Sequence, residues 1–193
     1  DDDYVVLLVA THPPASNKLF FYVNDVNITV VELDGVDFTN PDEFHLLQVL
    51  SNSDTIEFYL DNSLVHTEET ADIMIQGSSL MIGAKVTASE HSDEWNGYID
   101  EVRLWKERLP DELREMHYEF PGKLVNTIED STICNLRGLW TFDLEEPSLD
   151  IKDQKCTEIS DLNSIYNPCE INLCDYPLDA KIRGEAIFSA KQY

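Results

Sequence analysis

The stretch that decides the fold is Trp95-Asn96-Gly97-Tyr98-Ile99-Asp100-Glu101-Val102-Arg103-Leu104-Trp105, followed by Arg108-Leu109-Pro110-Asp111-Glu112-Leu113. Asn96 and Gly97 tolerate a positive φ and predict a turn. After this turn the side chains alternate, which predicts a strand. Its two faces carry Tyr98, Asp100, Val102 and Leu104 on one side, and Ile99, Glu101, Arg103 and Trp105 on the other. We expect Val102 and Leu104 to point inward.

A short helix is predicted to follow this strand. Pro110 stands at or next to its start, and Asp111 and Glu112 are acids that favour a first helical turn. The apolar residues that recur at helical spacing are Leu109, Leu113, Met116 and Phe120. Pro121-Gly122 ends the element. His117, on the same helix, is expected at the surface.

This succession resembles the last strand and closing helix of laminin-G-like domains, which are concanavalin-A-like jelly rolls. In that family a strand of the pattern G-x-I-D-E-V-R-[apolar]-W is followed by a leucine, a cap and an acidic helix. The resemblance begins at about residue 19 and continues to residue 120. It implies an all-β fold, an antiparallel jelly-roll β-sandwich with one short C-terminal helix and a Cys-containing irregular tail.

Two earlier segments carry the same resemblance. Residues 44–66 correspond to the family's W-H-H-V-A-V-T-Y-D-G-x-L-R-L-Y-V-D-G-E-L-V segment, with Phe44 in place of the tryptophan and Asn62 in place of the turn glycine. Residues 79–84 match its L-x-I-G-G strand. Because these landmarks occur in the family's order, they support one another.

Alternation and turn residues predict further strands. They cover residues 4–10, 19–23, 26–33, 44–50, 55–60 and 63–66, with Ile56, Phe58 and Leu60 alternating in the fifth and with a turn at Asp61-Asn62 after it. In the third strand Asn27 and Thr29 share the face opposite Val26, Ile28 and Val30. Asn27, the acceptor of the sequon Asn27-Ile28-Thr29, is therefore expected to point outward and to carry a glycan.

Past residue 122 the character of the sequence changes. Residues 136–143 (LRGLWTFD) resemble the segment that normally opens a family domain, G-L-x-x-Y-W-x-F-D-E-G, so the order of segments is rotated. We expect residues 1–122 to form a laminin-G-like sandwich, either complete or incomplete at its N-terminal side. Residues 123–193 are expected to be a connector and a Cys-rich segment, which either completes that sandwich or starts a next repeat.

The charge of the chain limits its partners. Its 193 residues include 38 acidic and 13 basic side chains, a formal net charge of −25 at pH 7. Nucleic acid is excluded, because phosphate binding needs clustered Lys and Arg, and an anionic membrane surface is excluded on the same ground. No segment approaches the about 20 apolar residues of a membrane span, so no membrane insertion is expected. The carboxylates fit divalent cations, a cationic partner, a saline extracellular setting, or simply a soluble surface.

The cysteines predict an exported protein. Cys134, Cys156, Cys169 and Cys174 all lie in the last third of the chain. Their gaps are wider than the paired C-x2-C spacing of zinc sites, which favours a disulfide framework and an extracellular or cell-surface location. The three ways of pairing four cysteines stay open.

The resemblance also implies a calcium site. In many sandwiches of this superfamily an Asp of the closing strand joins carbonyls and an acid of the opening strand in holding a structural calcium ion. Asp100 and Asp143 occupy these positions here, the second only if the terminal segment folds back. Calcium accepts hard oxygen ligands from distant segments. The alternative partner of an inward Asp100 is Arg103 or a hydroxyl group.

Two further groups of residues are candidate sites. Trp95 and Tyr98, with Trp105, are candidates for a platform that stacks on a sugar ring, although core packing is favoured for Trp105. Glu32, Asp34 and Asp37 are similar to the carboxylate strand of jelly-roll β-glucanases, where two carboxylates flank the scissile bond. Asp37 breaks the alternation of that strand and Gly35 interrupts it, so no catalytic residue is expected.

The sequence therefore predicts a non-catalytic extracellular adhesion or recognition module, which binds a glycan or a protein within a larger surface or matrix protein. The alternative is a structural repeat of an extracellular filament or adhesin, which contacts neighbouring repeats or subunits and has no ligand of its own. A glycosidase is a remote alternative. The fold alone does not separate these functions, because jelly rolls host all three.

Overall fold

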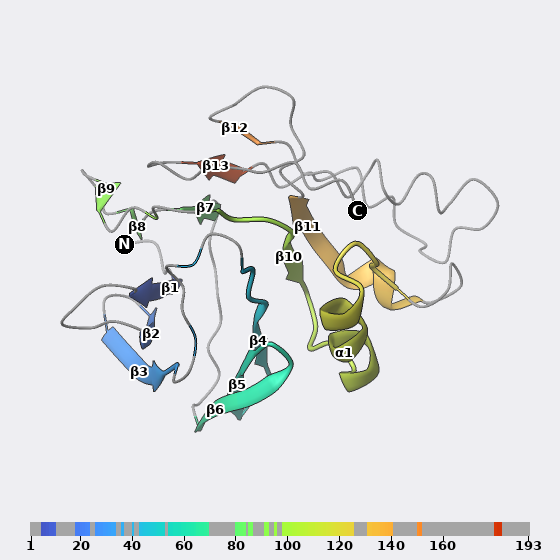
Figure 1. Cartoon of the computed structure of the whole chain (residues 1–193), viewed down its shortest axis with the longest axis horizontal. Helices are drawn as coiled ribbons and strands as arrows, with labels where there is room; N and C mark the ends of the chain where they lie inside the picture. Colours follow the sequence, from blue (N-terminus) through green and yellow to red (C-terminus); the bar gives the residue numbers. More distant parts are fainter. Residues whose placement is uncertain are drawn as a thin grey trace. The chain divides into compact units, whose positions relative to one another are not determined.

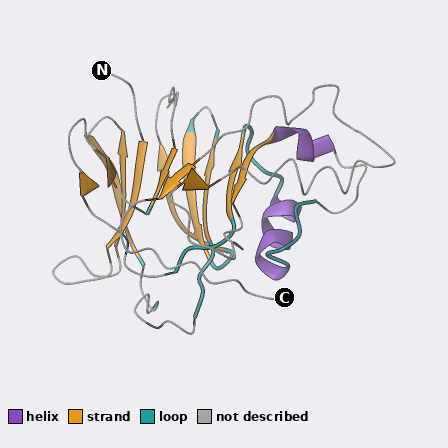
Figure 2. Cartoon of the chain, turned by 90° about the horizontal axis from the view of Figure 1, so that it is seen from above, coloured by secondary structure: helices purple, strands orange, loops and turns teal. Residues whose placement is uncertain are grey.

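The chain folds as two compact units, residues Asp1–Ser78 and Ser79–Tyr193 (Figure 1). The computed structural model describes residues 5–10, 18–23, 26–33, 36, 40, 43–52, 54–69, 80–83, 85–86, 91–92, 95, 98–125, 131–140, 150–151 and 180–182. Strands make up most of the regular structure in these residues (Figure 2). The expected boundary between residues 122 and 123 stays a prediction.

The first unit contains two three-stranded antiparallel sheets. One has the order β1-β2-β3 and the other β4-β5-β6, so each strand pairs with its neighbours in the sequence. The strands are β1 (Val5–Ala10), β2 (Lys18–Val23), β3 (Val26–Glu32), β4 (Leu47–Ser51), β5 (Thr55–Leu60) and β6 (Ser63–Glu69). All six lie within or close to segments that the sequence predicted as strands.

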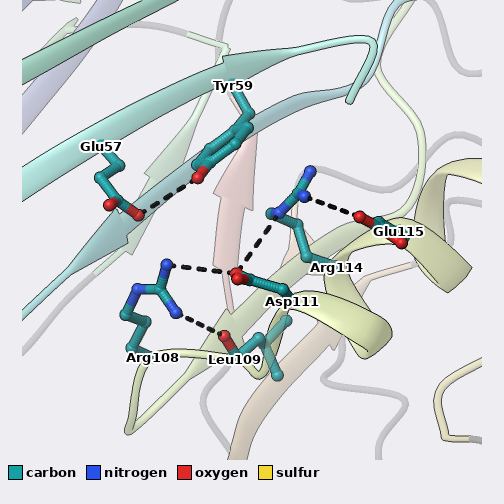
Figure 3. A network of polar contacts seen from close by, with 7 residues as sticks. All are labelled: Glu57, Tyr59, Arg108, Leu109, Asp111, Arg114 and Glu115. Atoms are coloured by element: carbon teal, nitrogen blue, oxygen red, sulfur yellow. Dashed lines mark hydrogen bonds and ion pairs between the residues drawn. The ribbon is translucent and has the colours of Figure 1, made fainter. Parts of the chain in front are cut away.

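Side chains from both sheets form one hydrophobic core in this unit. Its buried residues are Leu19, Phe21, Val31, Leu33, Ile56, Phe58 and Leu60. Phe58 is fully buried, and its ring meets that of Phe21 edge-on, with 5.6 Å between ring centroids. The predicted inward face of β5 is thus confirmed. Tyr59, on the other face of β5, is buried as well, and its hydroxyl donates to Glu57 at 3.4 Å (Figure 3).

The turn between β5 and β6 has the geometry that its residues favour. Asp61 (φ 48°) and Asn62 (φ 67°) both have a positive φ, as a two-residue hairpin turn with the right-handed strand twist requires. The Asp61 carboxylate accepts the backbone N–H of Leu46 at 2.9 Å and the Nδ1–H of His45 at 2.7 Å. Asp61 therefore confirms the predicted turn and also fixes it to the residues that precede β4.

An irregularity in the β2–β3 ladder changes which side chains of β3 face the core. Phe21 pairs with Thr29, whereas Tyr22 pairs with Asn27, so the register shifts between the two pairs. Thr29 is buried, with its hydroxyl 3.0 Å from Nε2 of His66, while Val30 is exposed. The expected outward position of Thr29 was wrong, because one extra residue in a strand reverses the alternation beyond it. The Asn27 side chain lies outside the described residues.

The second unit has shorter strands. They are β7 (Leu80–Ile82), β8 (Lys85–Val86), β9 (His91–Ser92), β10 (Val102–Trp105), β11 (Leu136–Trp140), β12 (Asp150–Ile151) and β13 (Ala180–Ile182). β13 pairs with β12 in antiparallel and with β7 in parallel orientation, and β8–β9 and β10–β11 are antiparallel pairs. A mainly antiparallel β fold is thus confirmed for the described residues, whereas the jelly-roll connectivity and the irregular Cys-containing tail stay predictions.

The predicted helix is present as α1 (Asp111–Glu119), directly after Pro110. Its apolar face, formed by Leu113 and Met116 together with Leu109, is buried against Trp105, as expected. Phe120 is exposed, contrary to its place in the predicted stripe. The helix ends before it, with φ −134° at Phe120, so helical spacing no longer places its side chain.

Arginine side chains pair with acids at the start of α1 (Figure 3). Asp111 lies between Arg108, at 3.2 Å, and Arg114, at 3.9 Å, and Arg114 also contacts Glu115 at 3.4 Å. The Asp111 and Glu115 carboxylates are exposed, so water screens these contacts and they contribute little to stability. They orient the first turn of the helix.

β10 and β11 join segments on either side of residue 122. Val102 pairs with Trp140 and Arg103 with Leu139, and the register shifts between Leu104 and Trp105. Leu136 and Leu139 of β11 share a hydrophobic core with Leu124 and Val125, which follow α1, and with Ile133 of η1 (Ser131–Asn135). Trp105 packs against this core. The segment that resembles the opening of a family domain is therefore paired with the predicted closing strand.

Candidate binding site

The segment that leads into β10 contains the two aromatic residues predicted to bind a ligand. The backbone N–H of Trp95 donates to the carbonyl of Gly83 at 2.7 Å, which fixes the segment to the end of β7. The Trp95 ring is half-buried, and its indole Nε1 is buried without an acceptor among the described residues. Tyr98 is 39% exposed. Of the two rings, that of Tyr98 is therefore the more accessible to a ligand.

Asp100 interacts with the backbone next to it. It is half-buried, and its Oδ1 accepts the N–H of Glu101 at 2.9 Å. Glu101 has a φ of 52°, a left-handed conformation that is costly for a residue with a side chain. This hydrogen bond helps to hold Glu101 in that conformation. Arg103, which together with a hydroxyl group was the expected alternative partner of Asp100, is paired with Glu101.

Arg103 connects β10 to the segment after α1. Its Nη2 donates to the Glu101 carboxylate at 2.7 Å, and both side chains are largely buried, 9% and 17% exposed. The same guanidinium donates to the carbonyls of Pro121 and of Lys123, the second at 3.2 Å. Because the planar guanidinium has several donors in a fixed arrangement, it holds three partners together. Arg103 is thus a structural residue of this region.

One residue of β10, Leu104, faces the opposite way from the prediction. Leu104, expected inward, is 40% exposed, whereas Trp105 packs against two hydrophobic clusters. The alternation was counted from Tyr98, but the positive φ of Glu101 interrupts the extended chain before β10 begins. The inward expectation for Leu104 was therefore wrong, while core packing of Trp105 is confirmed.

His117 was missed as a buried residue. It is 4% exposed, its ring stacks on that of Trp105 at 5.7 Å, and its Nε2–H donates to the carbonyl of Leu124 at 2.9 Å. Burial lowers the pKa of His117 to about 4; the hydrogen bond to Leu124 opposes this effect, and Arg103 adds to it. The surface expectation was wrong. The signal that could have corrected it is the spacing, since His117 follows the buried Leu113 by one helical turn.

The calcium prediction concerns Asp100 and Asp143. In the part of the chain that the structure describes, no three His, Cys, Asp or Glu side chains are grouped so as to hold a metal ion. Asp100 supplies one carboxylate there, and Asp143 lies outside the described residues.

The other predicted site residues are placed only in part. Cys134, in η1, is disulfide-bonded, while Cys156, Cys169 and Cys174 lie outside the described residues, so the pairing stays a prediction. Glu32, the first acid of the glucanase-like strand, is exposed and forms an ion pair with Lys18. Asp34 and Asp37 lie outside the described residues.

Comparison with known proteins gives one match. Residues 3–112 match a laminin-G family model described as concanavalin A-like lectin/glucanases superfamily. The match covers more than half of the 193 residues and includes β1 to β10. No curated protein and no solved structure matches the chain. Among the described residues, no helix is long and apolar enough to cross a membrane.

Proposed function

Because this chain belongs to the concanavalin A-like lectin/glucanases superfamily, we propose that it is a non-catalytic recognition module that binds a glycan or a protein. It acts outside the cell or at the cell surface, within a larger surface or matrix protein. Since folds of this class carry binding modules as well as enzymes, the site and not the fold must support this assignment.

The exposure of Tyr98 is the observation that carries the proposal. Its ring is accessible, although the segment around it is fixed by the hydrogen bond between Trp95 and Gly83 and by the Glu101–Arg103 ion pair. Exposed aromatic rings on a fixed backbone bind ligands at a low cost in conformational entropy. We assign Tyr98 as the ring on which the ligand stacks, and the half-buried Trp95, three residues earlier, as a second contact.

The environment of Glu32 supports the non-catalytic part of the proposal. Hydrolysis by a retaining glycosidase needs a nucleophilic carboxylate and a second, proton-donating carboxyl group about 5 Å away. The Glu32 carboxylate is instead paired with the Lys18 ammonium group at an exposed strand end.

Calcium is part of the proposal as a structural ion. Asp100 supplies one ligand, and Asp143 supplies another if the terminal segment folds back beside β10. The pairing of β10 with β11 supports this arrangement, because Asp143 follows β11 by three residues. A glycan on Asn27 and disulfides among Cys134, Cys156, Cys169 and Cys174 are further features proposed for an exported protein.

A glycan array probed with the whole chain, in millimolar calcium and in chelator, tests the proposal. We expect retention on a subset of glycans, with no reducing ends released. Release of reducing ends would contradict the non-catalytic assignment and favour a glycosidase. No retention on glycans, together with no binding to extracellular matrix proteins in a parallel solid-phase assay, would contradict recognition and favour the structural repeat.

A further inference from the structure

Three elements of the second unit meet at His117. Its ring stacks on Trp105 of β10, and it lies on α1. The third element is the connector, residues 121–125, to which His117 donates a hydrogen bond at the carbonyl of Leu124. Leu124 and Val125 are buried in the core that contains Leu136 and Leu139. His117 therefore joins the helix and the connector to the β10–β11 pair.

The hydrogen bond fixes the tautomer of the neutral ring. A carbonyl oxygen only accepts, so Nε2 carries the hydrogen and Nδ1 is the unprotonated nitrogen of the neutral ring. Protonation would add an N–H at Nδ1 and place a full positive charge on a side chain that is almost completely buried. The charge would have to be stabilised without water.

Among the charged groups of the elements that pack around His117, Arg103 opposes its protonation. Arg103 on β10 repels a second positive charge, and its carboxylate partner Glu101 is already engaged in an ion pair. The connector contributes Lys123, and α1 contributes the buried Arg114, three residues earlier on the same helical face. The hydrogen bond to the Leu124 carbonyl favours the charged ring, and the face of the Trp105 ring also attracts a cation. Burial and Arg103 outweigh these effects, since the pKa of His117 is lowered to about 4.

We propose that His117 is a proton-operated latch, which holds α1 and the connector on the β10–β11 pair when neutral and releases them when protonated. The direction follows from linkage. The ordinary pKa of His is 6.5 and that of His117 in the folded protein is about 4, so the closed state binds fewer protons than the open one. The latch is fully closed above pH 6.5 and weakens as the pH falls towards 4.

Hydrogen exchange of the whole chain measures this opening. We expect the equilibrium constant for opening of residues 111–125 to increase about 60-fold when the pH is lowered from 7 to 4.5. This value applies after correction for the intrinsic pH dependence of amide exchange. The amides of β5, in the other unit, serve as the internal reference and should not follow this rise. An equal change in β5 and α1, or none in α1, would overturn the proposal.

Two substitutions distinguish the latch from a non-specific effect of low pH on the stability of the whole chain. His117→Gln retains an N–H that can reach the Leu124 carbonyl but does not titrate, so the extra pH dependence of α1 should disappear. His66→Gln, at a histidine paired with Glu68 in the first unit, is the matched control, and it should leave the pH dependence of α1 unchanged. If His117→Gln keeps the pH dependence, the proposal fails. If that variant does not fold, the pKa of His117 measured by NMR in the unmodified chain decides, and a value near 6.5 overturns it.

Discussion

The indole ring of Trp140 lies against the backbone of Gly138, two residues earlier on β11. A β-carbon placed at Gly138 would come within 2.1 Å of the Trp140 ring, well inside any real contact. Trp140 is completely buried, so its ring cannot move aside into solvent. Gly138 is thus required by the close approach of a side chain, and its hydrogen atom is what leaves room for the ring.

Gly138→Ala should therefore destabilise the protein. Overpacking of a filled core costs about 1–3 kcal/mol, since the ring or the strand must shift. Gly122→Ala is the matched control, because no atom lies within 4 Å of a β-carbon at that position. Denaturant unfolding of both variants checks this. Equal stabilities would mean that Trp140 does not occupy this position in solution.

Phe58→Ala should cause a larger loss in the first unit. The ring is fully buried and packs edge-on against Phe21, so its removal leaves a cavity that costs about 3–5 kcal/mol. Phe44→Ala removes the same side chain from a position that is 40% exposed, and should cost clearly less. The free energies of unfolding of the two variants give the comparison. A change near zero for Phe58→Ala would place the wrong face of β5 in the core.

Arg103→Met should destabilise the second unit, because it leaves the largely buried Glu101 carboxylate without its partner. Loss of one member of a buried ion pair costs about 3–5 kcal/mol. Arg103→Lys keeps the charge but lacks the planar fork that also reaches Pro121 and Lys123, so we expect an intermediate loss. If thermal unfolding ranked the two variants in the opposite order, this structural role of the Arg103 guanidinium would be contradicted.

Calcium should stabilise the chain if Asp100 is a ligand. An ion present at 100 times its dissociation constant adds about 2.7 kcal/mol, which corresponds to a rise of about 5–10 °C in Tm for a chain of this size. Asp100→Asn should remove most of the difference between calcium and chelator, measured at matched ionic strength in sodium chloride. Equal Tm values of the unmodified chain in both solutions would end the calcium proposal.

Local patterns predicted the strands, the hairpin and the helix correctly. The alternation of Ile56, Phe58 and Leu60, the turn at Asp61-Asn62 and the position of Pro110 before α1 were all readable, because each depends on neighbours in the sequence. The family itself was also recognisable from motif order.

Side-chain direction was predicted poorly where the backbone departs from regular geometry. The positive φ of Glu101 made the alternation before β10 misleading for Leu104, and the shifted register of β3 did the same for Thr29. The burial of His117 depends on the carbonyl of Leu124, a contact that forms only after the connector turns back onto the helix. The register shift in β3 and the positive φ of Glu101 leave no periodic trace in the sequence, whereas the burial of His117 agrees with its spacing from Leu113.

The most direct test of the recognition function is the affinity of the Tyr98→Ala variant for a ligand retained by the unmodified chain on the array. Tyr118→Ala, at a tyrosine that is 44% exposed on α1, is the matched control. We expect a loss of at least tenfold in affinity for Tyr98→Ala, since removal of a central aromatic contact costs about 2 kcal/mol or more, and no loss for the control. Equal affinities of the two variants and the unmodified chain would contradict the assignment of this segment as the binding site.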